Sequence, residues 1–210
     1  MVGGVIFDAF GTILQIGQRT NPYLQLFREG RRQGRILGPN TIGCAMTMDL
    51  PLDEFAAHLG ITLRSTARQE LNRALELELS SIRPYPEALE AIEMLQKSGC
   101  QLGICSNLAA PFGRVVRELF PMMDGYAFSY EQAIMKPDPK IYLSTCDQMG
   151  VEPGDGFGVE MGRVYMIGDS PRCDRDGPRM VGIMGILLSR TRVGNIRDLT
   201  QFARLVIDQD

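Results

Sequence analysis

Four short apolar segments separated by longer amphipathic ones constrain the fold of this chain more than any other feature of its sequence. These segments are apolar on both faces, a pattern typical of strands buried in a parallel sheet. They are Val2–Phe7, Gln101–Cys105, Arg163–Ile167 and Gly182–Leu188. Because helical patterns lie between them, we predict an α/β fold, with an open parallel sheet covered by helices on both faces.

The segments between these strands carry helix signals. Pro86 suits the first turn of a helix in which apolar residues recur at intervals of three, and Gly99 ends it. Asp138 and Asn195 are candidate N-caps of two later helices. The later helices are predicted at Phe112–Phe120, Pro139–Met149 and Asn195–Val206. The glycine-rich segment Asp155–Gly162 is predicted to be a surface loop.

Residues 15–83 interrupt the alternation of strands and helices. This stretch is strongly charged and helical in pattern, most clearly at Leu63–Ser80, and no convincing strand appears in it. We therefore predict a small helical cap at residues 15–83, inserted after the first strand into a core made of residues 1–14 and 84–210.

The overall composition is that of an ordinary globular protein. The 210 residues, 44 % hydrophobic and 22 % charged, can form one core with a small insert. The net charge of −3 gives no general attraction to nucleic acid or to an anionic membrane. We therefore expect a small-molecule substrate and neither a nucleic-acid nor a membrane partner. No pattern in the sequence specifies an oligomeric state.

The cysteines and the hydropathy pattern indicate a cytoplasmic protein. The five cysteines are scattered without a CxxC pair, so neither a disulfide framework nor a zinc site is expected; they are Cys44, Cys100, Cys105, Cys146 and Cys173. The N-terminus lacks a signal-peptide pattern, and no apolar run approaches the ~20 residues of a membrane span.

Polar residues follow the first two predicted strands, where a parallel sheet binds its ligands. Asp8 ends the first strand, ahead of the turn residues Gly11 and Thr12. A carboxylate there can attack an electrophile and form a covalent intermediate, although it could also merely cap the turn. Ser106 and Asn107 follow the second strand and could bind an anionic oxygen, although both are common turn residues.

Charged residues occur at two further places that are candidates for the same ligand-binding edge of the sheet. Lys136 precedes Pro137 and offers a compact positive charge, although a surface lysine is the simpler interpretation. Asp169 directly follows the third strand, and Asp174 and Asp176 come soon after it. Carboxylates grouped in this way suit Mg²⁺ (magnesium), and Asp8 could complete the site; the alternative is a solvated acidic loop.

These residues lie in four motifs, FDAFGT, CSN, KPDPKIY and GDSPRCD, whose order resembles the haloacid dehalogenase-like (HAD) superfamily from Val5 to about Arg190. The resemblance implies a Rossmann-like core, a helical cap and hydrolase activity. It implies that Asp8 is the nucleophile, and that Ser106 and Lys136 hold the transferred group. Thr12, Ser106 and Asn107 are then the substrate-binding residues. The implied Mg²⁺ ligands are Asp8, Asp169 and the main-chain carbonyl of Phe10, with Asp174 in a supporting position.

Phe10 departs from the phosphatase pattern of this superfamily. In those phosphatases, the residue two positions after the nucleophile is a second aspartate, which protonates the leaving alcohol. A phenylalanine at this position cannot exchange a proton. General acid–base catalysis is typically worth about 10²- to 10⁴-fold. The L-2-haloacid dehalogenases instead carry FDAYGT and release a halide, which needs no proton. Those enzymes use no metal, however, and have a hydroxyl residue at the position of Asp169.

The motifs thus combine features of two branches, and three hypotheses follow. The leading one is a Mg²⁺-dependent hydrolase that uses Asp8 on a small phosphorylated compound, because Asp8 and Asp169 would repel each other without a cation. Its leaving group would need little protonation, as in acyl phosphates, aryl phosphates or certain phosphonates. The alternatives are a 2-haloacid dehalogenase-type hydrolase and a catalytically reduced binding or regulatory protein.

Three other features are given structural interpretations. The basic run FREGRRQGR is expected to form a solvated helix face rather than a substrate clamp. His58 is expected to have no catalytic role, and Tyr142 is expected to be a packing residue.

Overall fold

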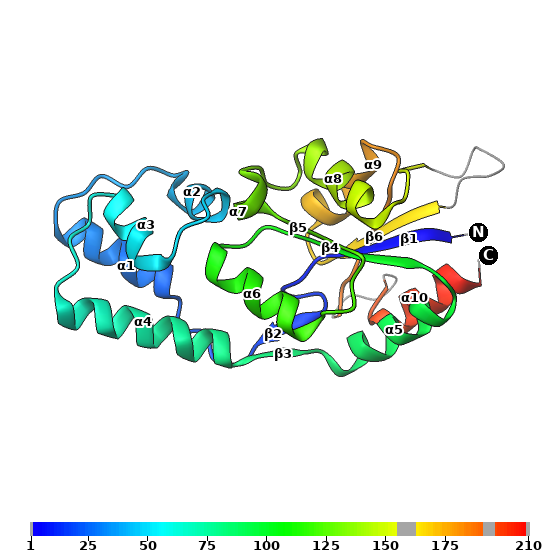
Figure 1. The fold of residues 1–210 in the computed structure, drawn as a ribbon, viewed down its shortest axis with the longest axis horizontal. Coiled ribbons are helices and arrows are strands. Elements are labelled where there is room, and N and C mark those ends of the chain that lie inside the picture. The colour runs from blue at the N-terminus through cyan, green and yellow to red at the C-terminus, as the bar shows by residue number, and fades with distance from the viewer. Residues whose placement is uncertain (1, 155–162, 191–195, 209–210) are drawn as a thin grey trace.

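The computed structural model describes residues 2–154, 163–190 and 196–208, and the structural statements below concern these residues. Five parallel strands form one sheet in the order β5-β4-β1-β6-β7. They are β1 (Val2–Phe7), β4 (Gln101–Ser106), β5 (Gly125–Phe128), β6 (Arg163–Gly168) and β7 (Met184–Leu187). Helices lie on both sides of this sheet (Figure 1). The predicted open α/β arrangement is therefore confirmed. Within the described ranges, no helix has both the length and the apolar character needed to cross a membrane.

Helices cover both faces of the sheet because its strands are apolar on both sides. Val5 and Phe7 pack in a cluster with α5 (Pro86–Lys97), α6 (Ala110–Leu119) and α10 (Leu199–Ile207). Ile6, which points the opposite way, packs in a second cluster with α8 (Pro139–Met149). The two-residue period of a strand thus sends alternate side chains into two separate layers of the core. Short helical segments complete this part: α7 (Ser129–Gln132), η1 (Pro171–Asp176) and α9 (Gly177–Arg179).

Several predicted element boundaries are confirmed and others shift. The Asp138 side chain caps α8 by accepting a hydrogen bond from Lys140 N, as expected. The predicted strand at Gly182–Leu188 is shorter, because Gly182 has a positive φ of 78° and belongs to a turn. The last helix begins at Leu199, since Asp198 caps it by accepting from Gln201 N. The proposed cap Asn195 and the predicted loop at 155–162 lie outside the described residues.

The stretch between β1 and α5 is mostly helical, but the prediction that it contains no strand is wrong. β2 (Leu14–Ile16) and β3 (Ile82–Pro84) pair antiparallel, so the two ends of the stretch lie side by side. Each strand is three residues long, too short for a two-residue period to be visible in the sequence. The helices between them are α1 (Pro22–Arg32), α2 (Thr41–Thr47), α3 (Leu52–His58) and α4 (Ser65–Ser80).

These four helices carry a hydrophobic cluster of their own. Its buried members all come from the range Leu26 to Leu71 and include Phe55 and Ala56 of α3. The division of the chain into a core and a cap at residues 15 and 83 stays a prediction.

Candidate functional site

Asp8 lies just beyond the carboxyl end of β1, where the chain turns sharply. Its main-chain N–H donates to Ile167 O in β6 at 2.9 Å, so strand pairing fixes its position. The following turn closes as the N–H groups of residues 12–14 donate to Ala9 O. Thr12 Oγ1 then donates to Asp8 Oδ2 at 3.2 Å. Asp8 is held in this turn with only 7 % of its surface exposed.

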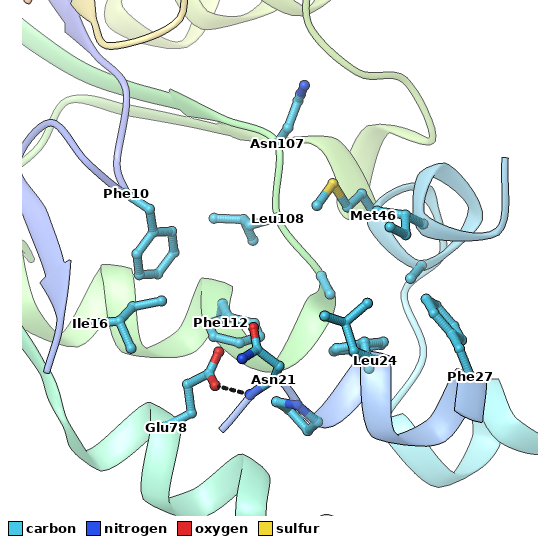
Figure 2. A pocket seen from close by; sticks show the side chains of 15 residues that line it. Phe10, Ile16, Asn21, Leu24, Phe27, Met46, Glu78, Asn107, Leu108 and Phe112 are labelled. Atoms are coloured by element: carbon cyan, nitrogen blue, oxygen red, sulfur yellow. Dashed lines mark hydrogen bonds between the residues drawn. The ribbon is translucent and has the colours of Figure 1, made fainter. Parts of the chain in front are cut away.

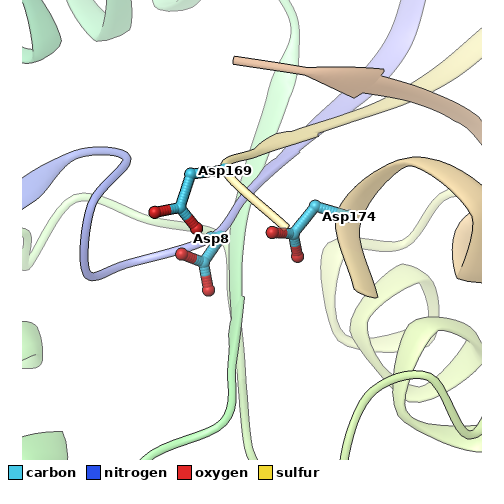
Figure 3. A group of neighbouring side chains, drawn as sticks. All are labelled: Asp8, Asp169 and Asp174. Atoms are coloured by element: carbon cyan, nitrogen blue, oxygen red, sulfur yellow. The ribbon is translucent and has the colours of Figure 1, made fainter. Parts of the chain in front are cut away.

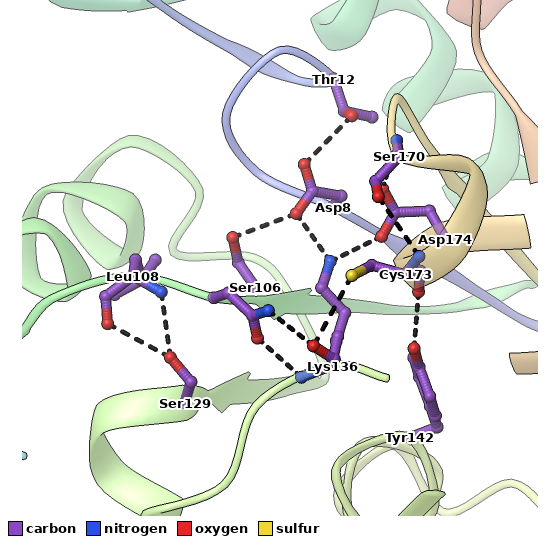
Figure 4. A network of polar contacts seen from close by, with 11 residues as sticks. Asp8, Thr12, Ser106, Leu108, Ser129, Lys136, Tyr142, Ser170, Cys173 and Asp174 are labelled. Atoms are coloured by element: carbon purple, nitrogen blue, oxygen red, sulfur yellow. Dashed lines mark hydrogen bonds and ion pairs between the residues drawn. The ribbon is translucent and has the colours of Figure 1, made fainter. Parts of the chain in front are cut away.

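Two further donors reach the same carboxylate from other parts of the chain (Figure 4). Ser106, the last residue of β4, donates from Oγ to Asp8 Oδ1 at 3.1 Å. Lys136 Nζ lies 2.7 Å from Asp8 Oδ1 and 2.7 Å from Asp174 Oδ1. Burial opposes the charged form of this lysine, but the two carboxylates outweigh it and raise the pKa of Lys136. Lys136 is therefore an ammonium ion that bridges two acidic side chains.

Asn107 positions Lys136 through paired hydrogen bonds. Its Nδ2 donates to Lys136 O at 2.9 Å, and its Oδ1 accepts from Lys136 N at 2.7 Å. The side-chain amide thus pairs with the main chain of Lys136 as a neighbouring strand would. The prediction that Asn107 binds substrate is not tested by this geometry, whereas its contact with Lys136 was not anticipated.

Asp169 and Asp174 bring two more carboxylates to Asp8. Each of the three offers a ligand oxygen, and these oxygens lie within 4.8 Å of one another (Figure 3). Asp174, in η1, also accepts from Ser170 N at 2.9 Å. Burial raises the pKa of Asp174 to about 6, although the positive charge of Lys136 acts to lower it. Burial, and then the charge of Asp8, also raise the pKa of Asp169.

The donor set fits a hard divalent cation such as Mg²⁺, which prefers carboxylate oxygens. Asp8 and Asp169 are distant in the sequence but lie close together, as the hypothesis of a shared Mg²⁺ requires. Gly11 makes this possible: a Cβ at this position would lie 2.2 Å from Asp169 Oδ2. Asp176 is not part of the group, because it is exposed and pairs with Arg175 at 2.7 Å.

A protein-family model described as haloacid dehalogenase-like hydrolase matches residues 2–182. The chain belongs to this hydrolase family. The expected resemblance is therefore confirmed, and it extends over the segments that carry Asp8, Ser106, Lys136 and Asp169.

Relatives of this HAD-like hydrolase come from both chemical branches of the family. One is (S)-2-haloacid dehalogenase 4A of Burkholderia cepacia, 26 % identical over 167 residues, or 71 % of each chain. Another is the glyceraldehyde 3-phosphate phosphatase of Methanopyrus kandleri, 27 % identical over 59 % of this chain and 50 % of the relative. A similar crystal structure is that of a HAD phosphatase from Thermococcus onnurineus, with a TM-score of 0.65, 24 % identity and 98 % coverage of both chains.

The Phe10 side chain of this HAD-like hydrolase lines an apolar pocket of about 350 Å³ (Figure 2). Its ring packs edge to face against Phe112 of α6, with centroids 5.7 Å apart. The core side of the pocket also includes Leu108 and Ala109, and the facing wall comes from α1 and α2. No local pattern in the sequence predicts this pocket, because its walls come from segments far apart in the chain.

Arg190 contacts the turn that follows Asp8, which the sequence did not predict. Its guanidinium donates to Thr12 O at 2.7 Å and forms an ion pair with Glu87 of α5. The group also lies over the Tyr85 ring, 3.9 Å from the centroid. Arg190 therefore braces the turn that carries Thr12 from outside, a role that no local sequence signal indicates.

The basic run is solvent-exposed and Tyr142 is a packing residue, as expected. The exposed arginines in and after α1 are Arg28, Arg31, Arg32 and Arg35. His58 stacks on Phe55 at the end of α3, and the expectation that it has no catalytic role stays a prediction. Tyr142 is fully buried and donates to Cys173 O at 2.6 Å.

Proposed function

We propose that this HAD-like hydrolase is a Mg²⁺-dependent phosphatase that acts on a small phosphorylated compound through Asp8. The observation that supports this most directly is the convergence of Asp8, Asp169 and Asp174 within 4.8 Å. One ammonium, that of Lys136, bonds to two of these three carboxylates. The remaining negative charge favours a divalent cation, and a substrate phosphate would add to it.

In the proposed reaction, a carboxylate oxygen of Asp8 attacks the phosphorus atom, and the bond from phosphorus to the leaving group breaks. Water then attacks the aspartyl phosphate, which releases inorganic phosphate and restores the carboxylate. Thr12, Ser106 and Lys136 hold the carboxylate of Asp8 in one orientation for both steps. A bound Mg²⁺, held by Asp8 and Asp169 with the Phe10 carbonyl and Asp174 nearby, would neutralise charge on the phosphoryl oxygens.

A panel of phosphate esters and acyl phosphates tests this proposal by the release of inorganic phosphate. We expect release that requires Mg²⁺, stops with EDTA and is lost in Asp8→Asn. The panel should include acetyl phosphate, whose leaving group needs no proton. Phosphate release that is absent, or that persists in Asp8→Asn, would refute the proposed phosphatase.

A 2-haloacid dehalogenase-type reaction is the second candidate. The Burkholderia cepacia relative favours it, as does the FDAFGT motif with its aromatic residue at position 10. In that reaction Asp8 would displace a halide and form an ester, which water then hydrolyses. Halide release from 2-chloropropionate that is insensitive to EDTA would support this candidate over the phosphatase. A cytoplasmic location stays part of either proposal.

A further inference from the structure

The pocket beside Phe10 adjoins the turn that follows Asp8. Phe10 is two residues from Asp8, and its ring is part of the pocket wall. Asn107, also in the wall, bonds to the main chain of Lys136, whose Nζ bonds to Asp8. The pocket and the acidic group are therefore joined through residues at the same edge of the sheet.

The size and lining of the pocket suit an aromatic ring. Phe10, Leu108 and Phe112 face one another from the core side, and Leu24 and Met46 face them from α1 and α2 (Figure 2). The volume of about 350 Å³ exceeds the ~150 Å³ cavity that holds a benzene molecule. The edge-to-face pair of Phe10 and Phe112 also offers ring surfaces against which a third ring can pack.

The chemistry at position 10 independently selects the same kind of group. Because Phe10 cannot donate a proton, the leaving group must depart as a stable anion. A phenolate meets this need far better than an alkoxide does, and its ring would fit in the pocket. An aryl phosphate therefore satisfies both the shape of the pocket and the absence of an acid.

Glu78 adds a charge preference at the far end of the pocket from Asn107. Its Oε2 accepts from Thr20 N and Asn21 N, at 2.6 Å each. A carboxylate in this place opposes a second anionic group on the ligand.

We propose that this pocket binds the ring of an uncharged aryl group whose phosphate is attacked by Asp8. The inference rests on the proposed function, because it assigns the substrate class of that same site. It predicts that the affinity of the protein for a ligand depends on the apolar group of that ligand and not on its phosphorus group alone.

Direct binding tests the inference without requiring turnover. Calorimetric titrations with phenylphosphonate, 4-carboxyphenylphosphonate and methylphosphonate, each with Mg²⁺, compare ligands that the enzyme does not need to hydrolyse. We expect phenylphosphonate to bind at least about tenfold more tightly than both of the others, because only it buries an uncharged ring. Equal binding of the phenyl and methyl compounds, or no binding of either, would overturn the inference.

A pair of leucine variants tests whether the pocket is the site of that preference. Leu24 lines the pocket and is 43 % exposed, whereas Leu89 in α5 is 48 % exposed and lies outside it. Leu24→Trp should fill the pocket and reduce the preference for phenylphosphonate to less than about threefold. Leu89→Trp should keep the preference of the wild type. An unchanged preference in Leu24→Trp would overturn the inference.

Acetyl phosphate separates this inference from the proposed function. Its Asp8-dependent hydrolysis, combined with equal binding of the phenyl and methyl phosphonates, would overturn the inference and leave the phosphatase intact. Preferential phenylphosphonate binding with no phosphate release from any substrate would support the pocket and refute the phosphatase.

Discussion

At the scale of single residues, Phe10 has two consequences for the proposed reaction. It supplies no proton for a leaving group, and its ring forms part of an apolar wall with Phe112. In the proposed phosphatase, both consequences favour a leaving group that is a stable anion without a proton and is attached to an apolar body.

Replacing Phe10 should reveal the missing acid. Phe10→Asp should raise kcat/KM for an alkyl phosphate by about 10²-fold, because its leaving alkoxide needs a proton. Acetyl phosphate, which does not need one, should gain much less. Phe10→Asn is the matched control, since it has a similar size and no acid. If both variants change alkyl phosphate hydrolysis equally, proton transfer is not what position 10 lacks. Inertness of Phe10→Asp toward every substrate, despite tight Mg²⁺ binding, would favour a binding or regulatory protein.

At the scale of elements, the turn between β1 and β2 lies so close to the end of β6 that position 11 in this turn has no room for a side chain. Gly11 has a φ of 87°, and the space where its Cβ would lie is taken by the carboxylate of Asp169. Arg190 also holds this turn, through Thr12 O. The turn therefore contacts both an acidic side chain and a half-buried cation.

Gly11→Ala should displace Asp169 and strain the turn. Because the new Cβ would lie 2.2 Å from Asp169 Oδ2, we expect kcat/KM to fall more than about tenfold and the Mg²⁺ concentration for half-maximal activity to rise. The free energy of unfolding should also fall by about 1–2 kcal/mol, from the positive φ.

Gly99→Ala is the control for this variant. Gly99 has a φ of 85°, but nothing lies within 4 Å of the position of its Cβ. Urea unfolding should show a similar loss of stability in both variants, while Mg²⁺ dependence should change in Gly11→Ala alone. Equal Mg²⁺ dependence in the two variants would contradict the proposed role of Asp169.

At the scale of the whole molecule, the helical stretch is tied at both of its ends. β2 pairs with β3, and close by, Glu78 of α4 accepts from the main chain at Thr20 and Asn21. Glu78 is 6 % exposed, so these bonds join a nearly buried carboxylate to two main-chain N–H groups.

Glu78→Gln should weaken this tie. The amide keeps one acceptor oxygen but loses the charge, so we expect the free energy of unfolding in urea to fall by about 1–3 kcal/mol. Glu76→Gln, an exposed glutamate on the same helix, should change it by less than about 0.5 kcal/mol. Equal effects of the two substitutions would show that the bonds from Thr20 and Asn21 contribute little.

Local patterns predicted four of the five strands of the sheet, but neither β5 nor the pairing of β2 with β3. β1 is apolar throughout, and the alternation of Val5 and Phe7 with Ile6 matches two buried layers. In contrast, Leu14 and Ile82 are each the single fully buried residue of a three-residue strand. Their pairing depends on the path of the intervening chain, and no local pattern describes that path.

The sequence by itself determined which side chains gather at the site, because every parallel strand ends at the same edge of its sheet. Asp8, Ser106 and Asp169 follow three such strands, so their order in the chain predicted their convergence. The tertiary structure alone decided the partners of Asn107 and Arg190 and the surroundings of Phe10. Those contacts join segments separated by long stretches of chain, and they depend on side-chain packing that residue spacing does not specify.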